Sequence, residues 1–164
     1  LNTMSSSASD SYPSTNTFTF VNATFTSTYI AFVPREIEDQ NQNQLQTLTS
    51  AQQAIFGQFD APPYTTSANA GGIPFIDYGN QFITLSSGFD PSLLHAGQDP
   101  NGTPMTYQQI ASKLSNPNDP VTQAILGNAN YMTAAICKLT NNKPSSVCSS
   151  AVIQKLEAGL PKHS

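Results

Sequence analysis

The sequence predicts a mixed α/β fold in a single domain that spans residues 1–164. Two observations carry this prediction. Aromatic and β-branched residues alternate with polar ones in much of the first half, which is typical of strands. In the second half, helix-start signals precede apolar residues spaced three or four apart. A chain of 164 residues is long enough to bury one ordinary core without many disulfides.

The first predicted strands lie in residues 18–33, where Phe, Tyr, Ile and Val recur at a period near two. Pro34 ends this run, because proline cannot donate a hydrogen bond to a ladder. Residues 35–46 are almost all polar, so we expect a turn or a hairpin tip there.

A helix and a second hairpin are predicted next. Thr49 and Gln52 form a capping-box pattern ahead of apolar residues spaced by four. Residues 60–72 contain paired prolines and paired glycines and are expected to form a loop. Residues 73–85 then predict two strands around Gly79-Asn80, a pair that favours a two-residue turn of the mirror-image kind.

The remaining predicted elements are helices, each with a recognisable start. Asp90-Pro91 is a cap followed by proline at the first helical position, and Gly97 is expected to end that short helix. Further starts are the capping-box pair Thr106 and Gln109, the pair Asp119-Pro120 ahead of a long apolar face, and Ser146 or Ser150 ahead of a last helix that stops at Gly159.

Composition narrows the class of protein. Charged residues make up 10% of the chain, well below the roughly 25% of an average soluble domain, and Ser, Thr, Asn and Gln take their place. Such a chain is either disordered or built for an acidic exterior, where amides and hydroxyls keep their hydrogen bonds. Nine Phe and six Tyr in periodic blocks favour the second interpretation.

Several partner classes are disfavoured by the same composition. The six basic residues are scattered and the net charge is −4, so no basic stripe for nucleic acid exists. The longest apolar run, residues 29–33, is far shorter than the roughly 20 residues that span a bilayer. Because Leu1 is not an initiator Met, we expect a processed or truncated product from which an upstream signal or anchor was removed.

Two cysteines and two sequons favour an extracellular or cell-surface location. The sequons are Asn22-Ala23-Thr24 and Asn101-Gly102-Thr103, and both asparagines are expected to carry glycans. Cys137 and Cys148 have a spacing that suits a disulfide between one helix end and the next helix, contributing about 3 kcal/mol. The alternative is a redox pair, but such pairs are usually Cys-x-x-Cys at a helix N-terminus.

The remaining motifs predict no catalytic residue, no metal site and no cofactor. His95 is expected to pack or cap a helix, and Asp77 is a single carboxylate in an apolar strand. The acidic residues within 36–39 are expected to form a solvated turn. The bond Ile73-Pro74 is either the ordinary start of a strand or a cis-proline beside an active site, and both interpretations stay open on local sequence.

The segment Gly72 to Phe82 resembles the cis-proline loop and the following hairpin of thioredoxin-like proteins. More closely, the chain resembles a family of thermoacidophilic archaea described as domain of unknown function 929. That resemblance covers nearly the whole chain. It is carried by Tyr12-Pro13, residues 17–20 (Thr-Phe-Thr-Phe), residues 29–34 (Tyr-Ile-Ala-Phe-Val-Pro), residues 114–118 (Leu-Ser-Asn-Pro-Asn) and residues 134–138 (Ala-Ala-Ile-Cys-Lys).

The resemblance implies a thioredoxin-like sheet, incomplete at its N-terminus, with additional C-terminal helices. It also implies extracytoplasmic thiol–disulfide exchange, with a cis bond at Pro74 and with Ile73 and Pro74 binding the substrate chain. The chain departs from the family because residues 1–164 contain no Cys-x-x-Cys, which is expected after a first strand. Either the chain was cut after that motif, and an active enzyme would use cysteines upstream of Leu1, or this copy lost the redox centre. The alternative is therefore a non-catalytic secreted surface or assembly module, and the partners expected are other secreted proteins or further copies of the chain.

Overall fold

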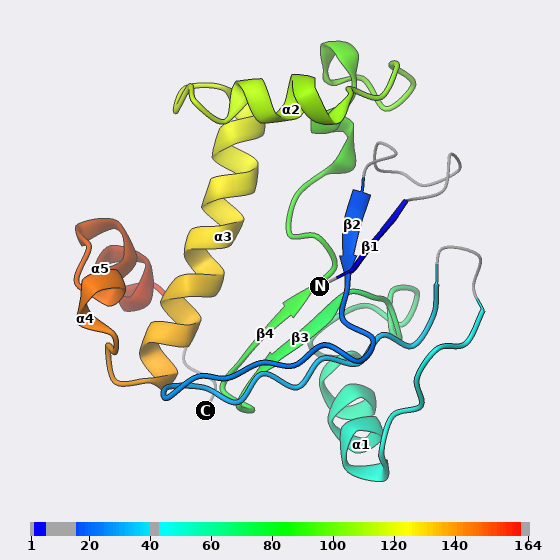
Figure 1. The fold of residues 1–164 in the computed structure, drawn as a ribbon, viewed down its shortest axis with the longest axis vertical. Helices are drawn as coiled ribbons and strands as arrows, with labels where there is room; N and C mark the ends of the chain where they lie inside the picture. The colour runs from blue at the N-terminus through cyan, green and yellow to red at the C-terminus, as the bar shows by residue number, and fades with distance from the viewer. Residues whose placement is uncertain (1, 6–15, 40–42, 162–164) are drawn as a thin grey trace. The chain divides into compact units, whose positions relative to one another are not determined.

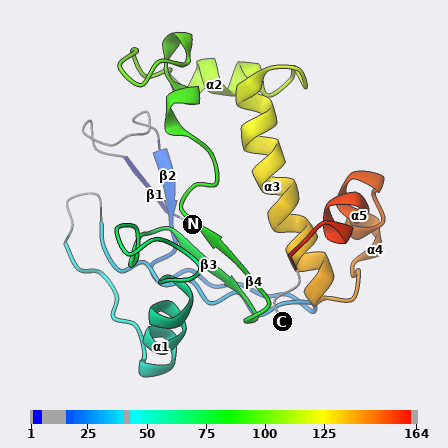
Figure 2. The same cartoon turned by 180° about the vertical axis from the view of Figure 1, so that it is seen from behind.

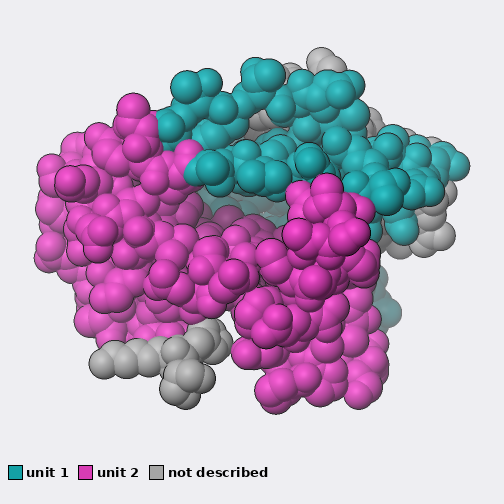
Figure 3. Space-filling view, turned by 90° about the horizontal axis from the view of Figure 1, so that it is seen from below, with its two compact units in different colours: residues 1–27, 31–47, 89–126 teal, residues 28–30, 48–88, 127–164 magenta. Residues whose placement is uncertain are grey.

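A computed structural model describes residues 2–5, 16–39 and 43–161. The chain divides into two compact units, coloured teal and magenta in Figure 3. Unit 1 contains residues 1–27, 31–47 and 89–126, and unit 2 contains residues 28–30, 48–88 and 127–164. Each unit is made of segments that alternate along the sequence. That the chain forms a single domain stays a prediction.

Unit 1 contains a small antiparallel sheet near its N-terminal end. Strand β1 (Asn2–Ser5) pairs with β2 (Asn16–Thr19), with Asn2 opposite Thr19. The prediction of strands throughout residues 18–33 is wrong beyond Thr19. Asn22 has a φ of 58°, which turns the chain out of an extended path. The aromatic residues that follow pack on one another instead of alternating across a sheet.

The two ends of the polar segment 35–46 of unit 1 pair in an antiparallel manner, in agreement with the predicted turn or hairpin. Glu38 and Gln44 form an isolated antiparallel bridge. The Leu45 N–H donates to the Ile37 carbonyl at 2.9 Å and the Asp39 N–H donates to the Asn43 carbonyl at 3.0 Å. Residues 40–42 lie outside the described residues.

The helical part of unit 1 consists of η1 (Pro91–Leu94), η2 (Ala96–Gln98), α2 (Tyr107–Lys113) and the first turns of α3 (Pro120–Leu139). The caps at Asp90 and Thr106 form as predicted. Gly97 does not end the first helix, which stops at Leu94. Gly97 lies inside η2 with a φ of 70°. Leu94, Met105 and Val121 form the buried core of this unit.

The first helix of unit 2 is α1 (Ser50–Phe59), whose Thr49–Gln52 capping box is present as predicted. The hairpin of β3 (Phe75–Tyr78) and β4 (Phe82–Leu85) follows (Figures 1 and 2). The ring of Phe56 meets the ring of Phe75 at 5.4 Å in an edge-to-face arrangement, so α1 packs on β3.

The hairpin turn has the mirror-image geometry that its sequence predicts. Gly79 and Asn80 have φ values of 60° and 58°, and the Gln81 N–H donates to the Tyr78 carbonyl at 3.1 Å. The strand register pairs Tyr78 with Phe82, so Gln81 is an extra residue between turn and strand.

The C-terminal part of unit 2 contains the rest of α3, then α4 (Ser145–Cys148) and α5 (Ala151–Ala158). Ser150 caps α5 and Gly159 ends it, in agreement with the sequence. Ala134, Cys137, Cys148 and Ile153 form the core that joins these helices. Within the described residues, no helix combines the length and the apolar character needed to cross a membrane.

The mixed α/β class is therefore confirmed, with helices predominating. The strands described form two sheets of two antiparallel strands each, one in each unit.

Candidate functional site

Ile73 and Pro74 lie directly ahead of β3 in unit 2, and both side chains are exposed to solvent. The Ile73 side chain is 52% exposed, whereas Tyr78 at the far end of β3 is buried. The Ile73–Pro74 peptide bond is cis, as predicted. The exposed Ile73 is thus an apolar side chain at the solvent surface where the chain enters the hairpin.

The hydrogen bonds of the hairpin determine which backbone groups face its outer edge. The Ser86 N–H donates to the Pro74 carbonyl at 2.9 Å, so Pro74 and Ser86 form a hydrogen-bonded pair. Such pairs alternate along an antiparallel ladder, so the pairs Phe75–Leu85 and Asp77–Ile83 are of the other kind. The N–H and C=O groups of Phe75 and Asp77 therefore point away from β4. Among the described residues, no strand pairs with that edge of β3.

The hairpin is held firmly by α3 within unit 2. The Asn128 side-chain amide donates to the Ser87 carbonyl at 2.7 Å, just after β4. At the other end, Gly79 lies against Leu139, whose Cδ2 would be 3.5 Å from a Cβ placed there. Asn128 and Leu139 are both on α3, roughly 16 Å apart at 1.5 Å per residue. The open edge of β3 thus belongs to a hairpin anchored near both of its ends.

The polar side chains of the hairpin serve its structure. The Asp77 carboxylate accepts a hydrogen bond from the Asn80 N–H at 2.9 Å and so stabilises the turn. Burial raises the pKa of the Tyr78 phenol above its ordinary value, against a smaller opposing effect of the hydrogen bond from Thr84. These groups do not form an acid–base pair aimed at a shared point.

Cys137 and Cys148 are joined in a disulfide, as predicted, with their Cα atoms 5.6 Å apart. Each residue is 1% exposed and packs against Ala134 and Ile153. The disulfide fastens the C-terminal end of α3 to α4. Since the sequence contains two cysteines and both are paired, the chain itself has no free thiol.

The comparison with known proteins identifies the family. A family model described as Domain of unknown function (DUF929) matches residues 1–138. This chain belongs to the DUF929 family. No curated protein and no solved structure matches it significantly. The resemblance inferred from the sequence is thus confirmed at the level of the family.

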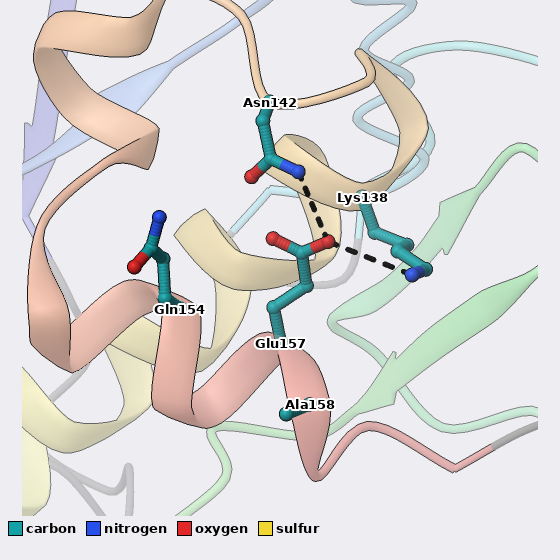
Figure 4. A pocket seen from close by; sticks show the side chains of 5 residues that line it. All are labelled: Lys138, Asn142, Gln154, Glu157 and Ala158. Atoms are coloured by element: carbon teal, nitrogen blue, oxygen red, sulfur yellow. Dashed lines mark hydrogen bonds and ion pairs between the residues drawn. The ribbon is translucent and has the colours of Figure 1, made fainter.

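A hollow of about 280 Å³ lies beside the disulfide-linked helices of the DUF929 chain (Figure 4). At its centre Glu157 accepts a hydrogen bond from the Asn142 amide at 3.3 Å and lies 3.6 Å from the Lys138 ammonium. The charged groups of this hollow are thus engaged with one another. These contacts connect the last turn of α5 to the end of α3. The sequence analysis did not predict them.

His95 lies at the junction of η1 and η2 in unit 1, as its predicted capping position requires. Its Nδ1 lies 3.2 Å from the Pro100 carbonyl, which can only accept, so Nδ1 carries the proton of that bond. The ring joins two parts of one loop, and among the residues that the structure describes it forms no hydrogen bond with a second titratable side chain. Within the described residues, no group of three His, Cys, Asp or Glu could hold a metal ion.

Both sequon asparagines of the DUF929 chain are described, and both are exposed. Asn22 lies in a turn after β2, and Asn101 lies in a turn after η2 in which its N–H donates to Asp99. Sequence reasoning found these residues, Ile73 and Pro74. It did not predict the open edge at Phe75 and Asp77, because the local sequence does not show whether another strand pairs with β3.

Proposed function

We propose that this chain is the client-binding part of an extracytoplasmic thioredoxin-like system for thiol–disulfide exchange. It binds an extended segment of a secreted client chain along the outer edge of β3. The observation that carries the proposal is the pair of outward-facing backbone sites at Phe75 and Asp77 beside the exposed Ile73.

The binding mode follows from the chemistry of a strand edge. An extended peptide that pairs with β3 satisfies the N–H and C=O groups of Phe75 and Asp77. These bonds are independent of client sequence, as binding to many clients requires. The Ile73 side chain adds an apolar contact at the end of the pairing region, and an apolar client residue that covers it removes apolar surface from water.

The exchange chemistry needs a thiolate from outside residues 1–164, because Cys137 and Cys148 are buried and paired. In that reaction the thiolate attacks one sulfur of a client disulfide and forms a mixed disulfide, and the other client sulfur leaves as a thiolate. The contribution of this chain is to hold the client chain in place while these bonds exchange.

The thioredoxin-like fold and the extracytoplasmic location are part of the same proposal. A hairpin that follows Ile73-Pro74 and packs on helices supports the fold, and an experimental structure of the chain tests it. A buried disulfide and two exposed sequons support a location where disulfides persist and glycans are attached.

The test is a matched pair of surface substitutions. Ile73→Asp places a charge beside the β3 edge, and Val152→Asp places one on α5, at a β-branched residue of similar exposure (56% against 52%). Binding of labelled, reduced and alkylated insulin B chain is measured by fluorescence anisotropy. We expect Ile73→Asp to weaken binding about tenfold or more, since burying such a side chain contributes about 1.5–3 kcal/mol. Equal affinities for both variants would refute the proposal.

The second candidate is a non-catalytic surface or assembly module, favoured by the buried disulfide that leaves no thiol for exchange. In that function the β3 edge pairs with a second copy of the chain. Sedimentation velocity separates the candidates. A dimer that Ile73→Asp converts to a monomer, without binding of the alkylated insulin chain, favours the assembly module over client binding.

A further inference from the structure

Three phenylalanine rings form an exposed group in unit 1, here called the aromatic cluster: Phe20, Phe25 and Phe32. The Phe32 ring lies between the other two, with ring centroids 5.5 Å from Phe20 and 5.5 Å from Phe25. The three residues are 36%, 52% and 43% exposed. A single exposed Phe is ordinary, but three rings linked through contacts with Phe32 form a larger apolar surface that a covering group would remove from water.

A tight turn directly follows Phe20 and carries Asn22. The Ala23 N–H donates to the Phe20 carbonyl at 3.0 Å, which closes a four-residue turn over residues 20–23. Asn22 occupies its third position with a φ of 58°, a conformation that Asn tolerates better than most residues.

The start of this turn is anchored by Glu36. One carboxylate oxygen, Oε2, accepts hydrogen bonds from the Thr19 hydroxyl at 2.6 Å and from the Phe20 N–H at 2.8 Å. The Phe20 backbone is therefore held on both sides, by Glu36 and by the turn. The backbone between Phe20 and Asn22 is therefore fixed by the folded chain, in the blue segment that follows β2 in Figure 1.

The sequon Asn22-Ala23-Thr24 thus lies between two members of the aromatic cluster in the sequence, with Asn22 two residues after Phe20 and three before Phe25. Asn22 is exposed, so its side-chain amide is accessible to a glycosyl transfer. The face of a sugar ring is rich in C–H groups, whose weak positive charge complements the negative face of an aromatic ring. Stacking a sugar on a phenylalanine also removes apolar surface from water.

We propose that Asn22 carries an N-linked glycan whose innermost sugar lies on the aromatic cluster and covers it. The glycan then acts as part of the folded structure, because it buries rings that the protein chain leaves in solvent. This inference rests on the extracytoplasmic part of the proposed function and is independent of client binding at Ile73.

The second sequon provides an internal control. Asn101 is also exposed, and its side-chain and backbone N–H groups both face the Asp99 carboxylate. The residues on either side of it are Asp99, Pro100, Gly102 and Thr103, none of which is aromatic. A glycan at Asn101 therefore has no neighbouring ring in the sequence to stack on, and it should contribute little to stability.

The experiment uses residues 1–164 secreted from a eukaryotic host, with site occupancy measured by peptide mass spectrometry. Thr24→Ala and Thr103→Ala each remove one sequon, and Phe20→Leu keeps an apolar side chain without an aromatic face. Thermal unfolding is followed for each variant. The same variants made without glycosylation in bacteria report any direct effect of the substitutions.

We expect Thr24→Ala to lower Tm by roughly 2–4 °C in the glycosylated chain and to leave Tm unchanged in the bacterial chain. Thr103→Ala should leave Tm of the glycosylated chain unchanged. Thr24→Ala should also leave Tm unchanged when it is combined with Phe20→Leu. An unmodified Asn22, an equal loss on Thr103→Ala, or an undiminished effect of Thr24→Ala in Phe20→Leu overturns the proposal. Binding of the alkylated insulin chain is measured on the same samples, so a failure here is separate from a failure of client binding.

Discussion

Removing the disulfide is the perturbation whose magnitude follows most directly from the structure. Cys137 and Cys148 are separated by 11 positions, so the bond closes a short loop between α3 and α4. Opening a loop of that length adds conformational entropy to the unfolded chain and lowers the free energy of unfolding by about 3 kcal/mol. For a chain of this size that corresponds to a fall in Tm of roughly 6–12 °C.

Two measurements isolate this effect. The first compares urea unfolding of the native chain, oxidised and after reduction and refolding, where both sulfurs stay in the protein. The second uses the double substitution Cys137→Ala and Cys148→Ala, which also removes two buried sulfurs. Its loss should equal or exceed that of the reduced chain, because both positions are 1% exposed and part of the core.

The double variant is also the control, because a reductant should not change its midpoint. Oxidised and reduced native chains with the same midpoint would refute the reasoning, as would two free thiols counted in the denatured, non-reduced chain. Either result would mean that the bond is absent or that the loop is equally ordered without it.

Two further predictions concern charge and activity. The hydrogen bond from the Lys113 ammonium holds the pKa of the Asp119 carboxyl below its ordinary value. The stability that this pair contributes is complete above the unfolded-state pKa of about 3.9. It is lost as the pH falls through the lowered pKa of the folded state. Asp119→Asn, which can still accept from the Val121 N–H, should therefore lower Tm more at pH 7 than at pH 2.5; the same difference at both pH values would contradict this. Residues 1–164 alone should reduce insulin no faster than the buffer with its reductant, since Cys137 and Cys148 are paired and buried; turnover abolished by Cys137→Ser would contradict the structural role of the pair.

Helix starts could be predicted because their causes are local. The capping boxes at Thr49 and Thr106 join residues three positions apart, and Asp119 caps α3 by accepting from the Val121 N–H. The turn at Gly79-Asn80 is local in the same way, because both residues tolerate a positive φ.

The strands of the first half were harder to predict. The alternation in residues 18–33 suggests strands, but a strand also needs a partner, and only β2 finds one, in β1. The partner residues, such as Asn2 and Thr19, are distant in sequence, and no local pattern specifies that pairing. Beyond Thr19, the turn at Asn22 and the contacts among Phe20, Phe25 and Phe32 replace extended structure.

By itself the sequence determined the family, the helix caps, the hairpin turn, the disulfide pair and the two sequons, because each depends on residue types at short and fixed spacings. Only the tertiary structure determined which other segments of the chain these features contact. Among the described residues it left the outer edge of β3 without a pairing strand, anchored the hairpin to Asn128, and brought the Phe32 ring against the rings of Phe20 and Phe25, which flank one sequon in the sequence. Such features depend on contacts between segments far apart in the chain, and the free energy of those contacts has no signature in any local stretch of sequence.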